Sequence, residues 1–222
     1  MVEFQAGNKI AKGYLAIPDR GEGPGVLVLH AWWGLNDFFK NLCDRLAGEG
    51  FVAFAPDLYD GKVAASIDEA KQLLEQRDGS FMHHAATGAV DFLRGHAAVR
   101  GKGLGAIGFS MGGAWSILLA SERPDDIAAV VVFYGSEGAD FSKARAAYLG
   151  HYAEVDEWEP LDGVRQMEAD MRAAGREVTF HIYPGVGHWF FESNRPDVYN
   201  AEAAQLAWQR TLTFLRSHLN GL

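Results

Sequence analysis

The chain has 222 residues, carries a formal net charge of −9 at pH 7, and is 48% hydrophobic, which is typical of a globular protein with a substantial core. The scattered acidic excess argues against a nucleic-acid surface, no apolar stretch has membrane-spanning length, and the single cysteine, Cys43, excludes an intrachain disulfide. The chain starts without the pattern of a secretory signal, so we expect a cytoplasmic protein that folds as one domain over residues 1–222.

Short apolar runs alternate with helical patterns along most of the chain. The predicted strands are, in chain order, 26–30, 51–55, 104–109, 127–134 and 178–183, with a weaker candidate at 144–150. The predicted helices are 37–50, 68–76, 82–93, one that begins just after Ser110, 161–174 and 201–219. This alternation indicates an α/β protein with a mostly parallel central sheet and helices on both faces. Binding and catalytic sites in such sheets lie beyond the carboxyl ends of the strands.

The segment 108–113 (GFSMGG) matches the G-x-S-x-G pattern between the strand at 104–109 and the helix that follows. This context is typical of a nucleophile elbow, in which Ser110 sits on a strained turn with its hydroxyl exposed. The free N–H groups at the start of the helix would stabilise a developing oxyanion. The alternative interpretation is a glycine-rich turn with a serine N-cap.

A serine hydroxyl needs a base to accept its proton, and His188 is the best candidate for that base. It lies in the glycine-rich loop 183–189, just past the last predicted strand, and thus at the carboxyl edge of the sheet. The alternative is a loop histidine that only bonds to backbone. Six other histidines are placed less well, at or inside strands, on a helix, before the acidic loop or near the C-terminus: His30, His83, His84, His151, His181 and His218. Of these, we expect His30 to have a supporting role.

The third group of such a site is an acid that orients the histidine, and it should lie between the serine and the histidine in the chain. The loop 151–160 (HYAEVDEWEP) offers Asp156 as the first choice and Glu154 as the second. The alternative interpretation of this loop is an acidic, solvated segment.

An oxyanion hole needs two backbone donors. We expect one to be the N–H of Met111, directly after the nucleophile, and the other to be the N–H of Trp32, after the first central strand. The indole rings of Trp32 and Trp33 either line the substrate pocket or serve as packing. The adjacent histidines on the helix at 82–93 point in different directions, so we expect no metal site.

Four segments taken together carry a more specific pattern, and they are 28–36 (VLHAWWGLN), 55–59 (APDLY), 108–113 (GFSMGG) and 183–188 (YPGVGH). In these segments the chain resembles the dienelactone hydrolase family, and the order of elements matches over nearly the whole chain. The resemblance implies the α/β-hydrolase fold. The family pattern also has an aspartate followed four residues later by a proline, here Asp156 and Pro160, which favours Asp156 over Glu154.

The chain departs from the family pattern at three positions. Founding members use a cysteine where this chain has Ser110, and a glutamate near that thiol where it has Ala31. Lactone-cleaving members hold a substrate carboxylate with an arginine four residues past the histidine, and this chain has Glu192 there. A carboxylate at that position would repel an anionic substrate, so we expect an uncharged ester, thioester or lactone with an apolar part.

The remaining pocket candidates are the aromatic residues beside the histidine. We expect Trp33, Trp189 and Phe190 to line the pocket together with Glu192, with a place in the core as the alternative. The function expected is that of a cofactor-independent serine hydrolase that cleaves a small ester or lactone through an acyl-enzyme. The alternatives are a non-catalytic ligand-binding protein, a thioesterase or a peptidase. We expect a monomer or homodimer that binds neither nucleic acid nor membrane.

Overall fold

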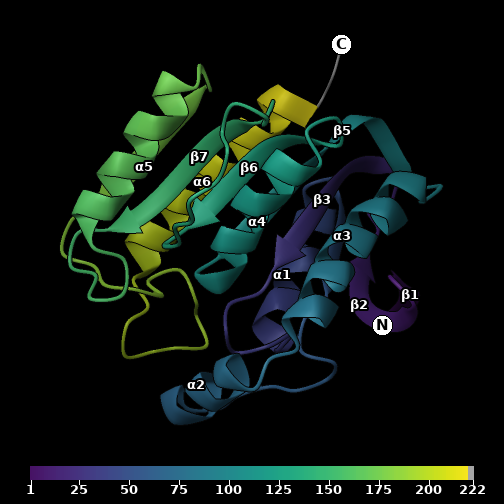
Figure 1. Cartoon of the computed structure of the whole chain (residues 1–222), viewed down its shortest axis with the longest axis horizontal. Coiled ribbons are helices and arrows are strands. Elements are labelled where there is room, and N and C mark those ends of the chain that lie inside the picture. The colour runs from purple at the N-terminus through teal and green to yellow at the C-terminus, as the bar shows by residue number, and fades with distance from the viewer. Residues whose placement is uncertain (220–222) are drawn as a thin grey trace.

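The computed structural model describes residues 1–219 and is built around one eight-stranded sheet with strand order β1-β2-β4-β3-β5-β6-β7-β8 (Figure 1). The strands are β1 (Val2–Ala6), β2 (Lys9–Ala16), β3 (Gly23–Leu29), β4 (Val52–Pro56), β5 (Val99–Phe109), β6 (Ile127–Phe133), β7 (Ala147–Ala153) and β8 (Val178–Tyr183). From β4 to β8 in this strand order, neighbouring strands are parallel. The first two strands are antiparallel, since β1 pairs with β2 and β2 pairs with β4 in that direction.

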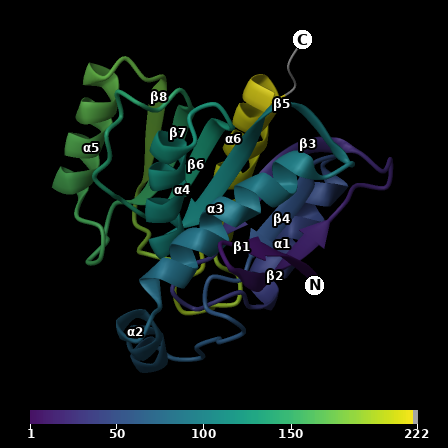
Figure 2. The same cartoon turned by 45° about the vertical axis from the view of Figure 1, so that its right-hand side comes forward.

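The helices cover both faces of this sheet, and they are α1 (Asp37–Gly48), α2 (Ile67–Glu75), α3 (Gly79–Gly95), α4 (Met111–Glu122), α5 (Leu161–Ala173) and α6 (Ala201–Leu219). Successive residues of each central strand point to opposite faces. In β3, for example, Val26 and Val28 join the core on one face, whereas Leu27 and Leu29 join the core on the other. Figure 2 shows α1 and α6 behind the sheet and α3 and α4 in front of it. Each central strand is therefore buried on both sides, which explains its unbroken apolar sequence.

The parallel strands that were predicted are confirmed, with ends that shift by a few residues. The weaker candidate at 144–150 is correct as an element, but the strand lies three residues later, because its pairing with β6 starts at Ala147. The hairpin formed by β1 and β2 was not predicted. Its residues alternate between buried and exposed, and it pairs with the sheet in the antiparallel direction through β4.

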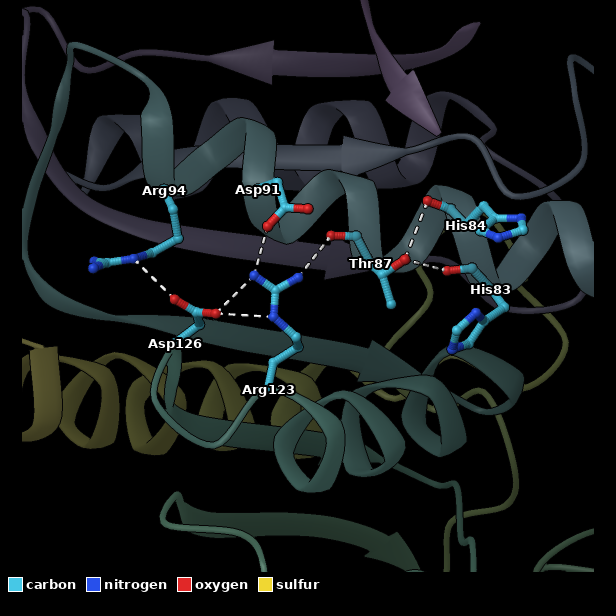
Figure 3. A network of polar contacts seen from close by, with 7 residues as sticks. All are labelled: His83, His84, Thr87, Asp91, Arg94, Arg123 and Asp126. Carbon is cyan, nitrogen blue, oxygen red and sulfur yellow. Dashed lines mark hydrogen bonds and ion pairs between the residues drawn. The ribbon is translucent and has the colours of Figure 1, made fainter. Parts of the chain in front are cut away.

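A polar network joins α3 to the end of α4 (Figure 3). Arg123, directly after α4, donates to Asp91 of α3 at 2.5 Å and to Asp126 at 2.9 Å. Arg94 of α3 contacts the same Asp126 at 3.3 Å. The network fixes the far end of α4, the helix that begins at the serine elbow, against its neighbour.

The loops that follow the parallel strands gather at one end of the sheet, together with α2 (lower side of Figure 1). The segments that carry the candidate site residues leave the sheet at this end. Within residues 1–219, no helix combines the length and the apolar character needed to cross a bilayer.

Candidate active site

Ser110 lies on a sharp turn between β5 and α4. Its backbone has φ 50° and ψ −115°, a conformation that few residues other than glycine adopt. Its N–H donates to the backbone oxygen of Phe133 at 2.9 Å, which ties the turn to β6. A Cβ on Gly108 would lie 2.1 Å from the backbone oxygen of Gly112, and one on Gly112 would lie 2.1 Å from that of Leu29. The two glycines of the motif therefore allow the close approach of backbone that the turn requires.

The structure brings His188 to this serine across 78 residues of sequence. Its Nε2 lies 3.0 Å from the Oγ of Ser110, and its Nδ1 lies 2.7 Å from Oδ2 of Asp156. Only 5% of His188 is exposed, so water reaches little of the ring. Ser110 itself is half-buried and keeps access to solvent. This arrangement can take a proton from the hydroxyl at one ring nitrogen while the other is held by a carboxylate.

Asp156 is oriented by its own loop. Its Oδ1 accepts the backbone N–H groups of Trp158 at 2.9 Å and Glu159 at 3.0 Å, which leaves Oδ2 for the histidine. Glu154, the second choice from sequence, does not contact His188. Its carboxylate accepts the N–H of Gly185 at 2.9 Å and so holds the start of the histidine loop.

The two candidate oxyanion donors lie at the start of α4 and in the loop after β3, and a buried histidine ties the second of these segments to the loop after β4. Met111 is the first residue of α4, so its N–H has no acceptor within the helix. Trp32 lies in the loop between β3 and α1. His30, at the start of that loop, is fully buried, donates from Nδ1 to the backbone oxygen of Ala31 at 2.7 Å, and accepts at Nε2 the N–H of Leu58 at 3.1 Å. Burial lowers the pKa of His30, so its ring is neutral, and the expected supporting role is that of a fixed link between two loops.

Four tryptophans pack together beside the site, and we refer to Trp32, Trp33, Trp158 and Trp189 as the indole cluster. The rings of Trp32 and Trp158 lie 5.1 Å apart between centroids, and those of Trp158 and Trp189 lie 5.8 Å apart. Trp158 is the most exposed member at 39%, whereas Trp33 has 1% of its surface exposed. Trp158 was not among the predicted pocket residues, although its position two residues after Asp156 is a signal that could have found it.

Three of the predicted pocket residues do not line an open pocket, and one of them is Trp33, with 1% of its surface exposed. Phe190 and Glu192 have no exposed surface, because the loop turns inward after Trp189, whose φ is +65°. Glu192 accepts the hydroxyl of Tyr134 at 2.9 Å, and burial raises its pKa to about 8. This burial argues against direct repulsion of a substrate by Glu192, and the expected preference for uncharged substrates stays a prediction.

The mostly parallel eight-stranded sheet, covered by helices on both faces and carrying a serine at a strand-to-helix turn, has the fold of the α/β-hydrolases. Residues 11–219 match the model of the dienelactone hydrolase family, and the chain belongs to this family of hydrolases.

Three known proteins illustrate the relationship. The chain is 38% identical to "Protein usf" of Aquifex pyrophilus, a match that covers 99% of this chain and 98% of that protein. It is 33% identical to a protein of Aquifex aeolicus named "Putative carboxymethylenebutenolidase", again with 99% and 98% covered. The crystal structure of a dienelactone hydrolase from Klebsiella pneumoniae, named as putative, is similar with a TM-score of 0.81 at 27% identity, over 98% of each chain.

Proposed function

We propose that the protein is a serine hydrolase that cleaves a small ester or lactone through an acyl-serine intermediate. The observation that carries this proposal is the continuous row of hydrogen bonds from Asp156 through His188 to Ser110, at 2.7 and 3.0 Å. The family and the name carboxymethylenebutenolidase given to a relative support a lactone or ester as the substrate class.

The first half of the proposed reaction forms the acyl-serine. Nε2 of His188 accepts the hydroxyl proton as Oγ of Ser110 attacks the carbonyl carbon. Asp156 accepts a hydrogen bond from Nδ1–H, which keeps Nε2 free as the base and stabilises the imidazolium. The backbone N–H groups of Met111 and Trp32 hydrogen-bond to the oxyanion. The intermediate then collapses, and His188 returns its proton to the departing alkoxide.

The second half releases the acid and restores the serine. A water molecule gives a proton to Nε2 of His188 and attacks the acyl carbon, and the second tetrahedral intermediate expels the oxygen of Ser110, which takes the proton back. For a lactone, the alcohol and the acid belong to one product, because the ring opens. The indole cluster beside His188 supports an apolar part in the substrate, since aromatic faces contribute large apolar contact areas.

The direct test compares turnover of a short p-nitrophenyl ester by the wild type, Ser110→Ala and Ser142→Ala. Ser142 is an exposed serine that hydrogen-bonds to Asp140 and provides the matched control. We expect Ser110→Ala to lose about three orders of magnitude or more in kcat, and Ser142→Ala to retain the wild-type rate. Equal turnover by wild type and Ser110→Ala would refute the proposal.

A further inference from the structure

Tyr134 connects the serine elbow to the histidine loop. It directly follows β6, next to Phe133, whose backbone oxygen holds the N–H of Ser110. Its own N–H donates to the backbone oxygen of His151 at 2.8 Å, which fixes the tyrosine between two strands. Its φ of +39° is unusual for a residue that is not glycine. The centroid of the phenol ring lies 4.8 Å from the centroid of the His188 imidazole, so the ring forms a wall against which the imidazole packs.

Glu192 holds the Tyr134 ring through its hydroxyl group. It lies four residues after His188 on the same loop, and its Oε1 accepts the hydroxyl of Tyr134 at 2.9 Å. Both side chains are fully buried, and the second carboxyl oxygen, Oε2, has no hydrogen-bond partner in the part of the chain that the structure describes. This single hydrogen bond therefore joins the end of β6, beside the nucleophile, to the loop that carries the base.

We infer that Glu192 is a positioning residue, which acts through its hydrogen bond with Tyr134 to hold the imidazole of His188 in line with Ser110. This inference rests on the proposed function and extends it to a residue that touches neither substrate nor the reacting atoms.

The charge state follows from the surroundings of the carboxyl. Burial raises the pKa of Glu192 to about 8, against the hydrogen bond from Tyr134 and the nearby charge of Arg195, which lower it. The guanidinium of Arg195 stacks on the ring of Trp33 at 3.7 Å, and it forms no ion pair with Glu192 within the described residues. The negative charge of Asp156 raises the pKa of the Tyr134 hydroxyl, as burial and Glu192 also do.

Ionisation of Glu192 would place in the core a charge whose one side-chain hydrogen bond comes from Tyr134, and such a charge is costly without further partners. We therefore expect the loop to leave its buried position as the carboxyl ionises, and the imidazole to lose the wall beside it. The expected consequence is a decline of kcat in the wild type as the pH rises through about 8, the pKa of Glu192.

The experiment measures kcat and KM for a p-nitrophenyl ester between pH 6 and 9.5. Glu192→Gln keeps an oxygen that accepts from Tyr134 but cannot ionise. We therefore expect its kcat to be within twofold of wild type at pH 7 and to show no decline near pH 8. Glu192→Ala and Tyr134→Phe lose the hydrogen bond, and we expect about a tenfold lower kcat with KM nearly unchanged. Tyr134→Phe keeps the ring and covers the case in which Glu192→Ala does not fold. Alkaline limbs that coincide for wild type and Glu192→Gln would overturn the inference, as would a loss at pH 7 in Glu192→Gln as large as in Tyr134→Phe.

A second measurement, independent of catalysis, separates this inference from the proposed function. The pKa of Glu192 is raised in the folded state. The contribution of this group to the stability of the wild type is therefore lost as the pH rises from its unfolded-state pKa to about 8, and Glu192→Gln has no such loss. We therefore expect the melting temperature of Glu192→Gln minus that of wild type to increase from pH 5.5 to pH 8.5. A difference in melting temperature that is constant with pH would contradict the expectation that Glu192 stays protonated in the folded protein near pH 7. A wild type that cleaves no ester, yet shows this increase, would refute the proposed function alone.

Discussion

At the scale of single residues, the site depends on which proton each nitrogen of His188 carries. Nδ1 faces the carboxylate of Asp156, which only accepts, so the proton sits on Nδ1 and Nε2 is free to accept from Ser110. The carboxylate itself is held by two backbone N–H groups and has 1% of its side chain exposed. The direction of the whole row of hydrogen bonds is thus set by the loop around Asp156.

The variant Asp156→Asn tests this direction. The amide oxygen of the asparagine can still accept the two loop N–H groups, but its NH₂ group then faces Nδ1 of His188. The ring is driven to carry its proton on Nε2, which can no longer accept from Ser110. We expect kcat to fall about 10⁴-fold, as in serine hydrolases that have this arrangement, while the fold is retained.

Glu154→Gln is the matched control for this measurement, since Glu154 lies two residues away and contacts Gly185 rather than His188. We expect kcat for p-nitrophenyl ester hydrolysis to stay within a few-fold of wild type. If Glu154→Gln lost as much activity as Asp156→Asn, the assignment of Asp156 as the orienting acid would be wrong.

At the scale of elements, the elbow exists because α4 starts in close contact with β3. A Cβ on Gly112 would lie 2.1 Å from the backbone oxygen of Leu29, a group that cannot move without breaking the sheet. We expect Gly112→Ala to destabilise the protein by about 3 kcal/mol and to displace Ser110, with loss of activity. Urea unfolding followed by circular dichroism measures the first effect, and ester turnover measures the second.

Gly163→Ala provides the control for this prediction, because Gly163 lies in the first turn of α5 and a Cβ there would meet no atom within 4 Å. We expect this variant to be as stable as wild type or more stable by up to about 1 kcal/mol, since alanine favours helix. Equal stability of Gly112→Ala and Gly163→Ala would contradict the close approach at the elbow.

At the scale of the whole molecule, the sequence was most informative where a strand is buried on both faces. The central parallel strands read as unbroken apolar runs because each lies between two helical layers. The hairpin of β1 and β2 has no such signal, since half of its side chains face solvent. Its place depends on pairing with β4, where the ring of Phe54 packs over Gly13.

The same division holds for the site. Ser110 and His188 were predictable because each follows a predicted strand and must emerge at the same edge of the sheet. Position alone left Glu154 as an alternative to Asp156, and the family resemblance favoured Asp156. The bond between Tyr134 and Glu192 joins residues 58 apart and depends on the inward path of the loop after Trp189. No periodicity or spacing encodes that path, so the sequence could suggest only a pocket position for Glu192.

The central claim is that the fold makes the hydroxyl of Ser110 a nucleophile. Labelling with a fluorophosphonate tests it most directly, because the reagent needs an activated serine and leaves a stable adduct whose position peptide mass analysis identifies. We expect one adduct per chain, on the peptide that contains Ser110, and none on Ser110→Ala or after denaturation. An intact mass without adduct, or an adduct on another residue, would contradict the account.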